Sequence, residues 1–375
     1  RALSLLGLNR ETPDPKGGKI GRWPDGRPNG YLEETAFTEL TSGMSRPDQA
    51  QMMKNLSAAE EIYLSHGITT IQDGLTKAPE WDMLKMMADH EAFKADVVAY
   101  VDIKDNARIM DENPEYVGKY KNHLKIGGYK LFLDGSPQGR TAWMQEPYLN
   151  SGDYKGYPIY SDQQVETYVK KSADEGRQLI VHCNGDAAAQ QLIDACEHVA
   201  AHGGRLDRPV MIHAQLVQEK QLEKMARLGM IASFFVAHTY YWGDIHLKNF
   251  GNERAEKISP VRTAQSLEVT TTFHQDTPVL PPDMIDTLWC ALNRVTKEGC
   301  LLDPNERPDM VDALSCITDQ CAYQYFEENE KGSIAAGKLA DFVILSENPL
   351  EVEPEAVKSI QVLETIKGGV TVWKK

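Results

Sequence analysis

Short β-rich runs alternate with helical patterns from residue 58 onward, and this alternation limits the fold more than any other feature of the chain. Strands separated by helix-length segments pair in parallel, because each connection has to return the chain to the same edge of the sheet. Seven strands over about 220 residues is the density typical of a (β/α)₈ barrel. The sequence therefore predicts an α/β fold, a TIM-like (β/α)₈ barrel with seven strands visible and one strand missing. The runs are 67–72, 96–102, 128–134, 178–182, 209–213, 230–235 and 269–276.

The flanks of the predicted barrel, which spans residues 58–330, have a different character. Residues 1–57 are rich in Gly, Pro and charge and show no sustained period, so we expect part of an insertion or cap. Residues 331–375 hold two hairpin-like strand runs, too few to close a core alone, so we expect them to pair with strands from elsewhere in the protein. Helices are predicted over 161–175 with Ser161 as N-cap, 186–201, 218–228 and 310–328.

Charge and composition exclude several classes of protein. The chain has 40 Lys+Arg against 55 Asp+Glu, a net charge of −15, and no basic run longer than two, so we expect neither nucleic acid nor a membrane as partner. No stretch of 18 apolar residues occurs. The six cysteines form no C-x-x-C pair, which favours reduced thiols and a cytoplasmic location.

Four ionisable residues fall at the C-terminal ends of predicted strands, where barrels of this type keep their active sites. Strand alternation predicts that Lys130 points into the barrel, because its leucine neighbours turn toward the helices. The same alternation predicts that His182 and His213 point inward and that Ile212 packs outward. Taken singly, each histidine is more often a hydrogen-bonded core residue than a ligand, and it is their shared location with Lys130 and Asp276 that indicates a polar site.

Imidazole and carboxylate groups that lie together are suitable ligands for a divalent metal, Zn²⁺ in particular. The sequence does not decide between one ion and two. A metal would lower the pKa of a bound water to about 7 and generate a hydroxide nucleophile. Asp276 could then act as general base, taking a proton from the water and passing it to a leaving nitrogen. His274 lies on the same face of the strand as Asp276. A buried Lys130 cation has to neutralise, pair, or become carbamylated by CO₂, which would make it a carboxylate ligand.

Two further interpretations concern neighbouring residues. The segment 238–246 is aromatic-rich and follows a strand, so it lines a substrate pocket or forms a packed loop, at even odds. Asp134 and Glu146 are close enough in sequence for a metal-free glycosidase with two carboxylates, a weaker alternative. The candidate substrate-binding residues, chosen by loop position, are Arg140, Trp143, Tyr240, Trp242 and His246.

The chain resembles the amidohydrolase superfamily, and within it amidohydrolase family 3, the group of N-substituted formamide deformylase-like enzymes. The resemblance rests on eight stretches in order, among them HGITTIQDG, HCNGDAAAQQLIDA, HTYYWGDIH, HQDTPVLPPD and GSIAAGKLADFVIL. It implies a metal-dependent hydrolase of C–N bonds in amide-type small molecules. It also implies that Lys130 is an active-site lysine that can be carboxylated to bridge two metals, that His182 and His213 are metal ligands, and that Asp276 is both ligand and base. The implied fold is a barrel, here lacking strand one, that is joined to a small composite β-sandwich made from both chain ends, with residues 331–375 as the C-terminal half of that sandwich.

One departure from the family pattern is large. The family begins its barrel with a His-x-His pair, and no H-x-H occurs in this sequence. We therefore expect that the chain is part of a longer enzyme and lacks an N-terminal portion. The alternative is a non-catalytic, degenerate barrel that binds a small molecule or regulates a partner, using the aromatic loop near Trp242. A homodimer is compatible with a barrel of this size.

Overall fold

The computed structural model describes residues 2–15, 18–37 and 48–375, and its internal contacts divide the chain into two units, Arg1–Met52 and Met53–Lys375. Each unit has a hydrophobic cluster of its own. Helix α3 (Gln49–Ser65) crosses the boundary between them.

The first unit is built around a small hairpin. After helix α1 (Ala2–Leu5), strand β1 (Gly18–Arg22) pairs antiparallel with β2 (Pro28–Glu34). The sequence shows no sustained period in this segment, so the hairpin was not predicted. The alternating pattern of a strand is missing because Ile20 is the one fully buried side chain in β1 and β2.

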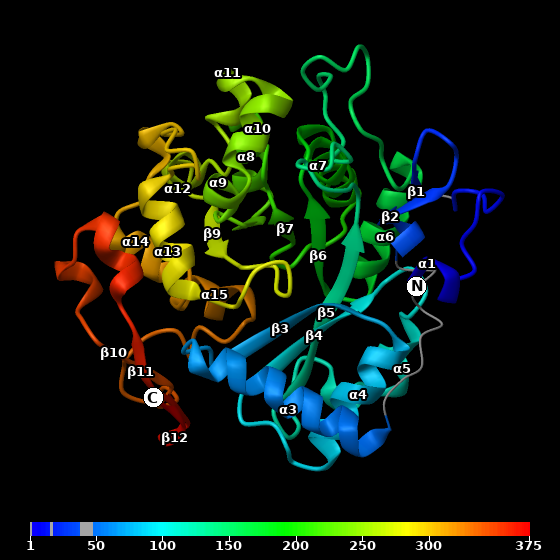
Figure 1. Cartoon of the computed structure of the whole chain (residues 1–375). Coiled ribbons are helices and arrows are strands. Elements are labelled where there is room, and N and C mark those ends of the chain that lie inside the picture. Colours follow the sequence, from blue (N-terminus) through cyan, green and yellow to red (C-terminus); the bar gives the residue numbers. More distant parts are fainter. Residues whose placement is uncertain (1, 16–17, 38–47) are drawn as a thin grey trace. The chain divides into compact units, whose positions relative to one another are not determined.

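The second unit contains a curled sheet of seven parallel strands in chain order, with helices packed against it, as Figure 1 shows. Each of the seven predicted runs overlaps one of these strands, so the TIM-like (β/α) prediction is confirmed. Parallel pairing also aligns the strand ends, which brings their C-terminal residues to one edge. The strands are β3 (Thr70–Thr76), β4 (Asp96–Asp102), β5 (Leu124–Phe132), β6 (Gln178–Cys183), β7 (Val210–His213), β8 (Ile231–Phe234) and β9 (Thr270–Phe273).

The helices of this unit follow local sequence signals. Ser161 caps α6 with a reciprocal capping box to Gln164, as predicted. The predicted helix over 310–328 is instead broken in two, because Thr318 has the non-helical angles φ −128° and ψ −94°. The helices are α4 (Ala78–Asp89), α5 (Arg108–Glu112), α6 (Asp162–Asp174), α7 (Asp186–Ala201), α8 (Glu219–Arg227), α9 (His238–Tyr241), α10 (Gly243–Phe250), α11 (Asn252–Ala255), α12 (Val261–Ser266), α13 (Met284–Asn293), α14 (Met310–Ser315) and α15 (Asp319–Gln324), with 3₁₀ turns η1 (Pro114–Tyr116), η2 (Pro304–Glu306), η3 (Pro349–Glu351) and η4 (Pro354–Ser359).

The two faces of the seven-stranded sheet bury different sets of side chains. The helix-facing side belongs to the large core, which includes Leu131 and Val181. The opposite, inner face holds a smaller cluster: Val98, Tyr100, Ile180, Val210, Ile212 and Ile231. The inner face therefore combines this apolar cluster with buried polar residues, among them Gln178 at the start of β6 and Lys130 near the end of β5.

The C-terminal strands form a separate antiparallel sheet in the order β10 (Phe342–Leu345), β11 (Val362–Lys367) and β12 (Val370–Lys374). Within the second unit, Thr365 on β11 donates a hydrogen bond of 2.7 Å to the carbonyl of Leu64, and this fixes the sheet to the end of α3. All six cysteines are unpaired. Within the described ranges, no helix combines the length and the apolar character needed to cross a bilayer.

Candidate metal centre

Three histidines line up across the ends of β6, β7 and β9. His182 Nδ1 lies 3.0 Å from His213 Nε2, and His213 Nδ1 lies 3.3 Å from His274 Nε2. His213 therefore sits between the other two rings and faces them with opposite nitrogens. Ser233 Oγ, 3.0 Å from His274 Nδ1, holds the outer ring of the row.

The inward position of His213 has a cause that alternation did not predict. Ile212 packs in the inner cluster, so the prediction that it faces outward was wrong. Strict alternation would then send His213 to the helix side. Instead, His213 and Ala214 adopt positive φ angles of 72° and 46°, and this backbone turn redirects the His213 side chain to the inner edge. Such angles are uncommon for residues other than glycine and mark functional or strained positions.

A carboxylate joins this row. Asp276, with a φ of 57°, follows β9 and lies with His213 and His274 so that one ligand atom from each is within 4.8 Å of the others. His274 was not among the predicted ligands, although its place two residues before Asp276 on one strand face was the signal that could have found it. Asp276 is solvent-accessible on one side; burial of the rest raises the pKa of its carboxyl, and Lys130 opposes that rise.

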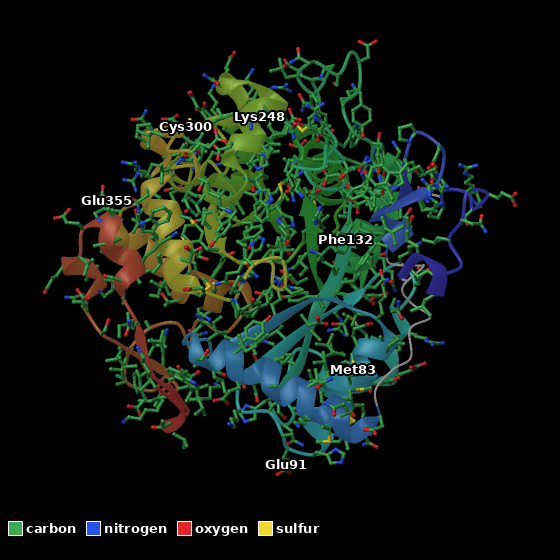
Figure 2. The ribbon with its side chains drawn as sticks, viewed as in Figure 1. Met83, Glu91, Phe132, Lys248, Cys300 and Glu355 are labelled. Carbon is green, nitrogen blue, oxygen red and sulfur yellow. The ribbon has the colours of Figure 1, made fainter. Side chains whose placement is uncertain are left out.

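Lys130 lies on the inner face of β5 and is 4% exposed. Its Nζ is 4.8 Å from the ring centre of Phe132, the last residue of β5, which is labelled in Figure 2. Among the described residues no carboxylate is within ion-pair distance of Lys130. Burial therefore lowers the pKa of its amine to about 8, although Asp276 acts in the opposite direction.

The three histidines are neutral because they are buried together. Burial, followed by the nearby Lys130, lowers the pKa of His182 to about 3, and the same causes with His182 lower that of His274 to about 3. Burial and the flanking histidines also lower the pKa of His213 well below its usual value. Neutral imidazoles keep a lone pair for a metal, whereas imidazolium ions do not.

The donor set fits a divalent metal. Imidazole nitrogens and a carboxylate oxygen are the ligands that Zn²⁺ and related ions take in catalytic sites. Two nitrogens at about 2.0–2.1 Å from a tetrahedral ion are about 3.3 Å apart. The separation of His213 Nδ1 and His274 Nε2, 3.3 Å, agrees with this.

Asp134 has a structural role in the same region. Its carboxylate accepts hydrogen bonds from the backbone N–H groups of Trp143 (2.9 Å), Asn184 (3.0 Å) and Gly185 (2.7 Å). It thereby ties the loop after β5 to the loop after β6, the strand that carries His182 next to its last residue. With its oxygens occupied in this way, Asp134 gives no support to a glycosidase carboxylate pair with Glu146.

The five candidate substrate-binding residues are distributed over three places. Trp143 is half-buried against the main core, and Arg140 donates from Nε to Asn249 on α10 over 2.8 Å. Tyr240 packs edge-on against Trp289, away from the histidine row. Trp242 and His246 both contact His238, a residue that the sequence analysis did not single out: the ring centres are 4.8 and 5.2 Å from that of His238.

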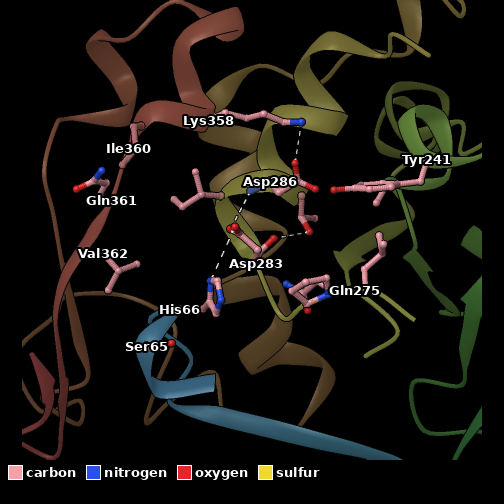
Figure 3. A pocket seen from close by; sticks show the side chains of 15 residues that line it. Ser65, His66, Tyr241, Gln275, Asp283, Asp286, Lys358, Ile360, Gln361 and Val362 are labelled. Atoms are coloured by element: carbon pink, nitrogen blue, oxygen red, sulfur yellow. Dashed lines mark hydrogen bonds and ion pairs between the residues drawn. The ribbon is translucent and has the colours of Figure 1, made fainter. Parts of the chain in front are cut away.

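A pocket of about 350 Å³ borders the centre through Gln275, the residue between His274 and Asp276 (Figure 3). Its walls come from the end of α3, the loop after β9, helix α13 and residues 358–362. Two polar pairs cross it, Lys358 with Asp286 at 2.9 Å and His66 with Asp283 at 3.9 Å. Tyr241, but neither Tyr240 nor Trp242, lines this space.

Comparisons with known proteins agree with this architecture. The protein LONG AFTER FAR-RED 3 of Arabidopsis thaliana is 29% identical over 387 residues, covering 99% of this chain and 66% of that protein. The N-substituted formamide deformylase of Arthrobacter pascens is 25% identical over 394 residues, covering 100% of this chain and 70% of that enzyme. The chain therefore spans about two thirds of the length of these relatives.

A solved structure and a family profile also match the chain. The crystal structure of an uncharacterized metal-dependent hydrolase from Pyrococcus furiosus superposes with a TM-score of 0.75 at 24% identity, covering 93% of this chain and 69% of that one, which establishes the shared fold. The profile of the amidohydrolase family matches residues 1–373. The chain therefore belongs to the amidohydrolase family.

Proposed function

We propose that this protein is a metal-dependent hydrolase that cleaves a C–N bond of the amide or formamide type. The observation that carries the proposal is the convergence of His213, His274 and Asp276, with ligand atoms within 4.8 Å of one another at the C-terminal edge of the sheet. His182 extends this donor set through its contact with His213. The deformylase among the relatives supports a small N-substituted amide as substrate.

When bound, a divalent metal supplies Lewis acidity, which polarises a carbonyl and lowers the pKa of water. The protein's own part in the reaction is proton transfer. Asp276 lies at the open, solvent-accessible side of the histidine row, so its carboxylate is placed to accept a proton from water and to deliver it to the leaving nitrogen. Each neutral histidine keeps one ring nitrogen with a free lone pair as a potential ligand.

Lys130 is proposed as a carboxylated ligand. A neutral amine adds to the carbon of CO₂ through a new N–C bond and releases one proton, which leaves a carbamate with two oxygen donors. The absence of an acidic partner among the described residues and a pKa near 8 both favour the neutral amine that this addition needs. As a carbamate, Lys130 would add negative charge to a site where two of its neighbours are uncharged imidazoles.

The test uses the protein as its source produces it. Metal-loaded and chelator-stripped samples are assayed for formate release from a series of N-alkylformamides. The proposal expects turnover by the loaded protein, at least 100-fold less after stripping, and recovery when Zn²⁺ or Mn²⁺ is returned. Equal turnover before and after stripping would contradict a metal-dependent reaction.

A further inference from the structure

Two buried histidines face each other next to the candidate metal centre, and neither is used by the proposed reaction. His238, at the start of α9, is 3% exposed, and His246 on α10 is fully buried. Their rings stack with a centre separation of 5.2 Å, and His238 Nδ1 lies 3.0 Å from His246 Nε2. Imidazoles held this closely in a buried place are joined by a hydrogen bond.

The phenyl ring of Phe235 connects this pair to the metal centre. Its centre is 5.4 Å from that of His274, 6.2 Å from that of His213 and 4.8 Å from that of His238. His238 therefore packs against a ring that also contacts two of the proposed ligands. The ring centre of Trp242 lies 4.8 Å from that of His238, so a second aromatic ring packs against this histidine.

Hydrogen bonding fixes which nitrogen of each ring carries the proton. Burial lowers the pKa of His246 to about 3, so the ring is neutral and has one N–H. His246 Nδ1 is buried and has no hydrogen-bond partner among the described residues. Since buried N–H groups without an acceptor are rarer in proteins than unpaired acceptors, the proton of His246 lies on Nε2 and is donated to His238 Nδ1.

This arrangement leaves His238 with its own proton on Nε2. No other described residue pairs with that nitrogen, so it is a donor without a protein acceptor. We infer that His238 donates its Nε2–H to a substrate bound at the candidate metal centre, and that His246 is the positioning residue that fixes this tautomer.

The position of His238 also defines the substrate class. Because His238 is not one of the proposed ligands, we assign to it an acceptor atom on the substituent rather than the scissile carbonyl, which a bound metal would polarise. The favoured substrates are then amides whose substituent carries a hydrogen-bond acceptor such as an ether or carbonyl oxygen. The role of His238 toward a substrate rests on the proposed function. The assignment of the two tautomers does not depend on it.

The first test therefore needs no turnover. Long-range ¹H–¹⁵N spectra of the full protein labelled with ¹⁵N-histidine report the tautomer of each ring, with His238→Gln and His246→Gln providing the assignments. We expect both rings as the Nε2–H form, and a shift of the His238 Nε2 signal on adding N-(3-methoxypropyl)formamide but not N-pentylformamide. A proton on His238 Nδ1, or the same response to both amides, would overturn the inference.

The second test compares kcat/KM for the same two formamides, which differ by one ether oxygen. The wild-type protein should prefer the methoxypropyl compound by about tenfold, the effect of about 1.4 kcal/mol expected of one hydrogen bond. His238→Phe and His246→Phe should abolish that preference at unchanged metal content, in samples that thermal unfolding shows to be folded at the assay temperature, whereas His238→Gln, which keeps an N–H donor, should retain part of it. An unchanged preference in His238→Phe would refute the role of His238, while no turnover of either formamide by the loaded wild type would instead refute the proposed function.

Discussion

His213 Nδ1 lies 3.3 Å from His274 Nε2, although β7 and β9 are not neighbours in the sheet and β8 runs between them. The contact exists because both side chains lie at or beyond the last residues of their strands, where β8 no longer separates them. The positive φ of His213 completes it by turning that side chain to the inner edge. The candidate centre therefore depends on backbone conformation as much as on residue type.

His274 is expected to be a metal donor equivalent to His213. Replacing His274 with Ala should weaken Zn²⁺ affinity by about 10- to 100-fold, the loss that follows removal of a residue supporting or forming a metal site. Competition titration with a chromophoric chelator measures this affinity directly. His198→Ala, which removes an exposed histidine on α7, is the matched control, and equal affinities in the two variants would mean that His274 is not a donor.

Acid should destabilise the protein through Asp96. Burial raises the pKa of Asp96, but a hydrogen bond from His123 and ion pairs to Lys331 (2.6 Å) and Lys367 (2.7 Å) outweigh it and hold that pKa well below its usual value. A depressed carboxyl pKa stabilises the fold above the unfolded-state pKa of about 4, and this contribution is lost as pH falls toward the folded-state pKa.

Urea unfolding at several pH values compares the wild type with Asp96→Asn. At pH 7 the variant should lose about 1.5–3 kcal/mol of unfolding free energy, because two buried lysines each lose one of their two carboxylate partners, while Lys331 keeps Glu327 and Lys367 keeps Asp341. The difference between the two proteins should shrink as the pH is lowered below 4. A difference that stays constant from pH 7 to pH 3 would show that the ionised carboxylate of Asp96 does not stabilise the fold.

Gly185 should not tolerate a side chain. A Cβ at this position would lie 1.9 Å from the carbonyl oxygen and 2.5 Å from the carbonyl carbon of Trp143, so backbone would have to move. We expect Gly185→Ala to destabilise the protein by about 1–3 kcal/mol or more. Gly74→Ala is the control, since nothing lies within 4 Å of its Cβ position; thermal unfolding that ranks the two variants equally would contradict the close approach.

Arg294 should be among the most sensitive positions away from the metal centre. Its guanidinium is buried and donates to the backbone carbonyls of Ser259 (3.0 Å), Glu256 (2.9 Å), Ile258 (2.8 Å) and Asp303 (3.1 Å). Arg294→Met would leave these carbonyls unsatisfied, and we expect a loss of about 3–5 kcal/mol in unfolding free energy.

The control for Arg294 is an arginine at the surface. Arg262 is half-exposed and pairs with Asp312 at 2.7 Å, an arrangement that contributes less than about 1 kcal/mol. Chemical unfolding of Arg294→Met and Arg262→Met should therefore differ by several-fold in the free energy lost. Similar losses would show that the buried carbonyl network does not stabilise this region.

Local patterns were enough to predict the seven strands, because each run is a β-rich segment bounded by turn residues and its position needs no knowledge of the rest of the chain. The hairpin of β1 and β2 was not predicted because its sequence carries no such local pattern. Ile20 is the single side chain that it buries fully, and a period cannot be recognised from one residue.

The candidate centre was predictable only in part. The positions of Lys130, His182 and Asp276 at the strand ends follow from the strand pattern, and the inner position of Lys130 follows from alternation. The inward turn of His213 does not, since a positive φ at a histidine leaves no local mark in the sequence, and alternation gave the wrong side for Ile212. The pairing of His238 with His246 depends on how α9 and α10 pack, which is decided by tertiary contacts.

The most direct test of the central claim is the metal content of the protein as its source produces it, measured by elemental analysis together with His213→Ala and the control His198→Ala. The account predicts one or two equivalents of divalent metal in the wild type and in His198→Ala, and a loss of at least one equivalent in His213→Ala. A wild-type protein that holds no divalent metal after incubation with Zn²⁺ and removal of the excess, or a His213→Ala variant that keeps the full amount, would contradict a metal centre at these residues.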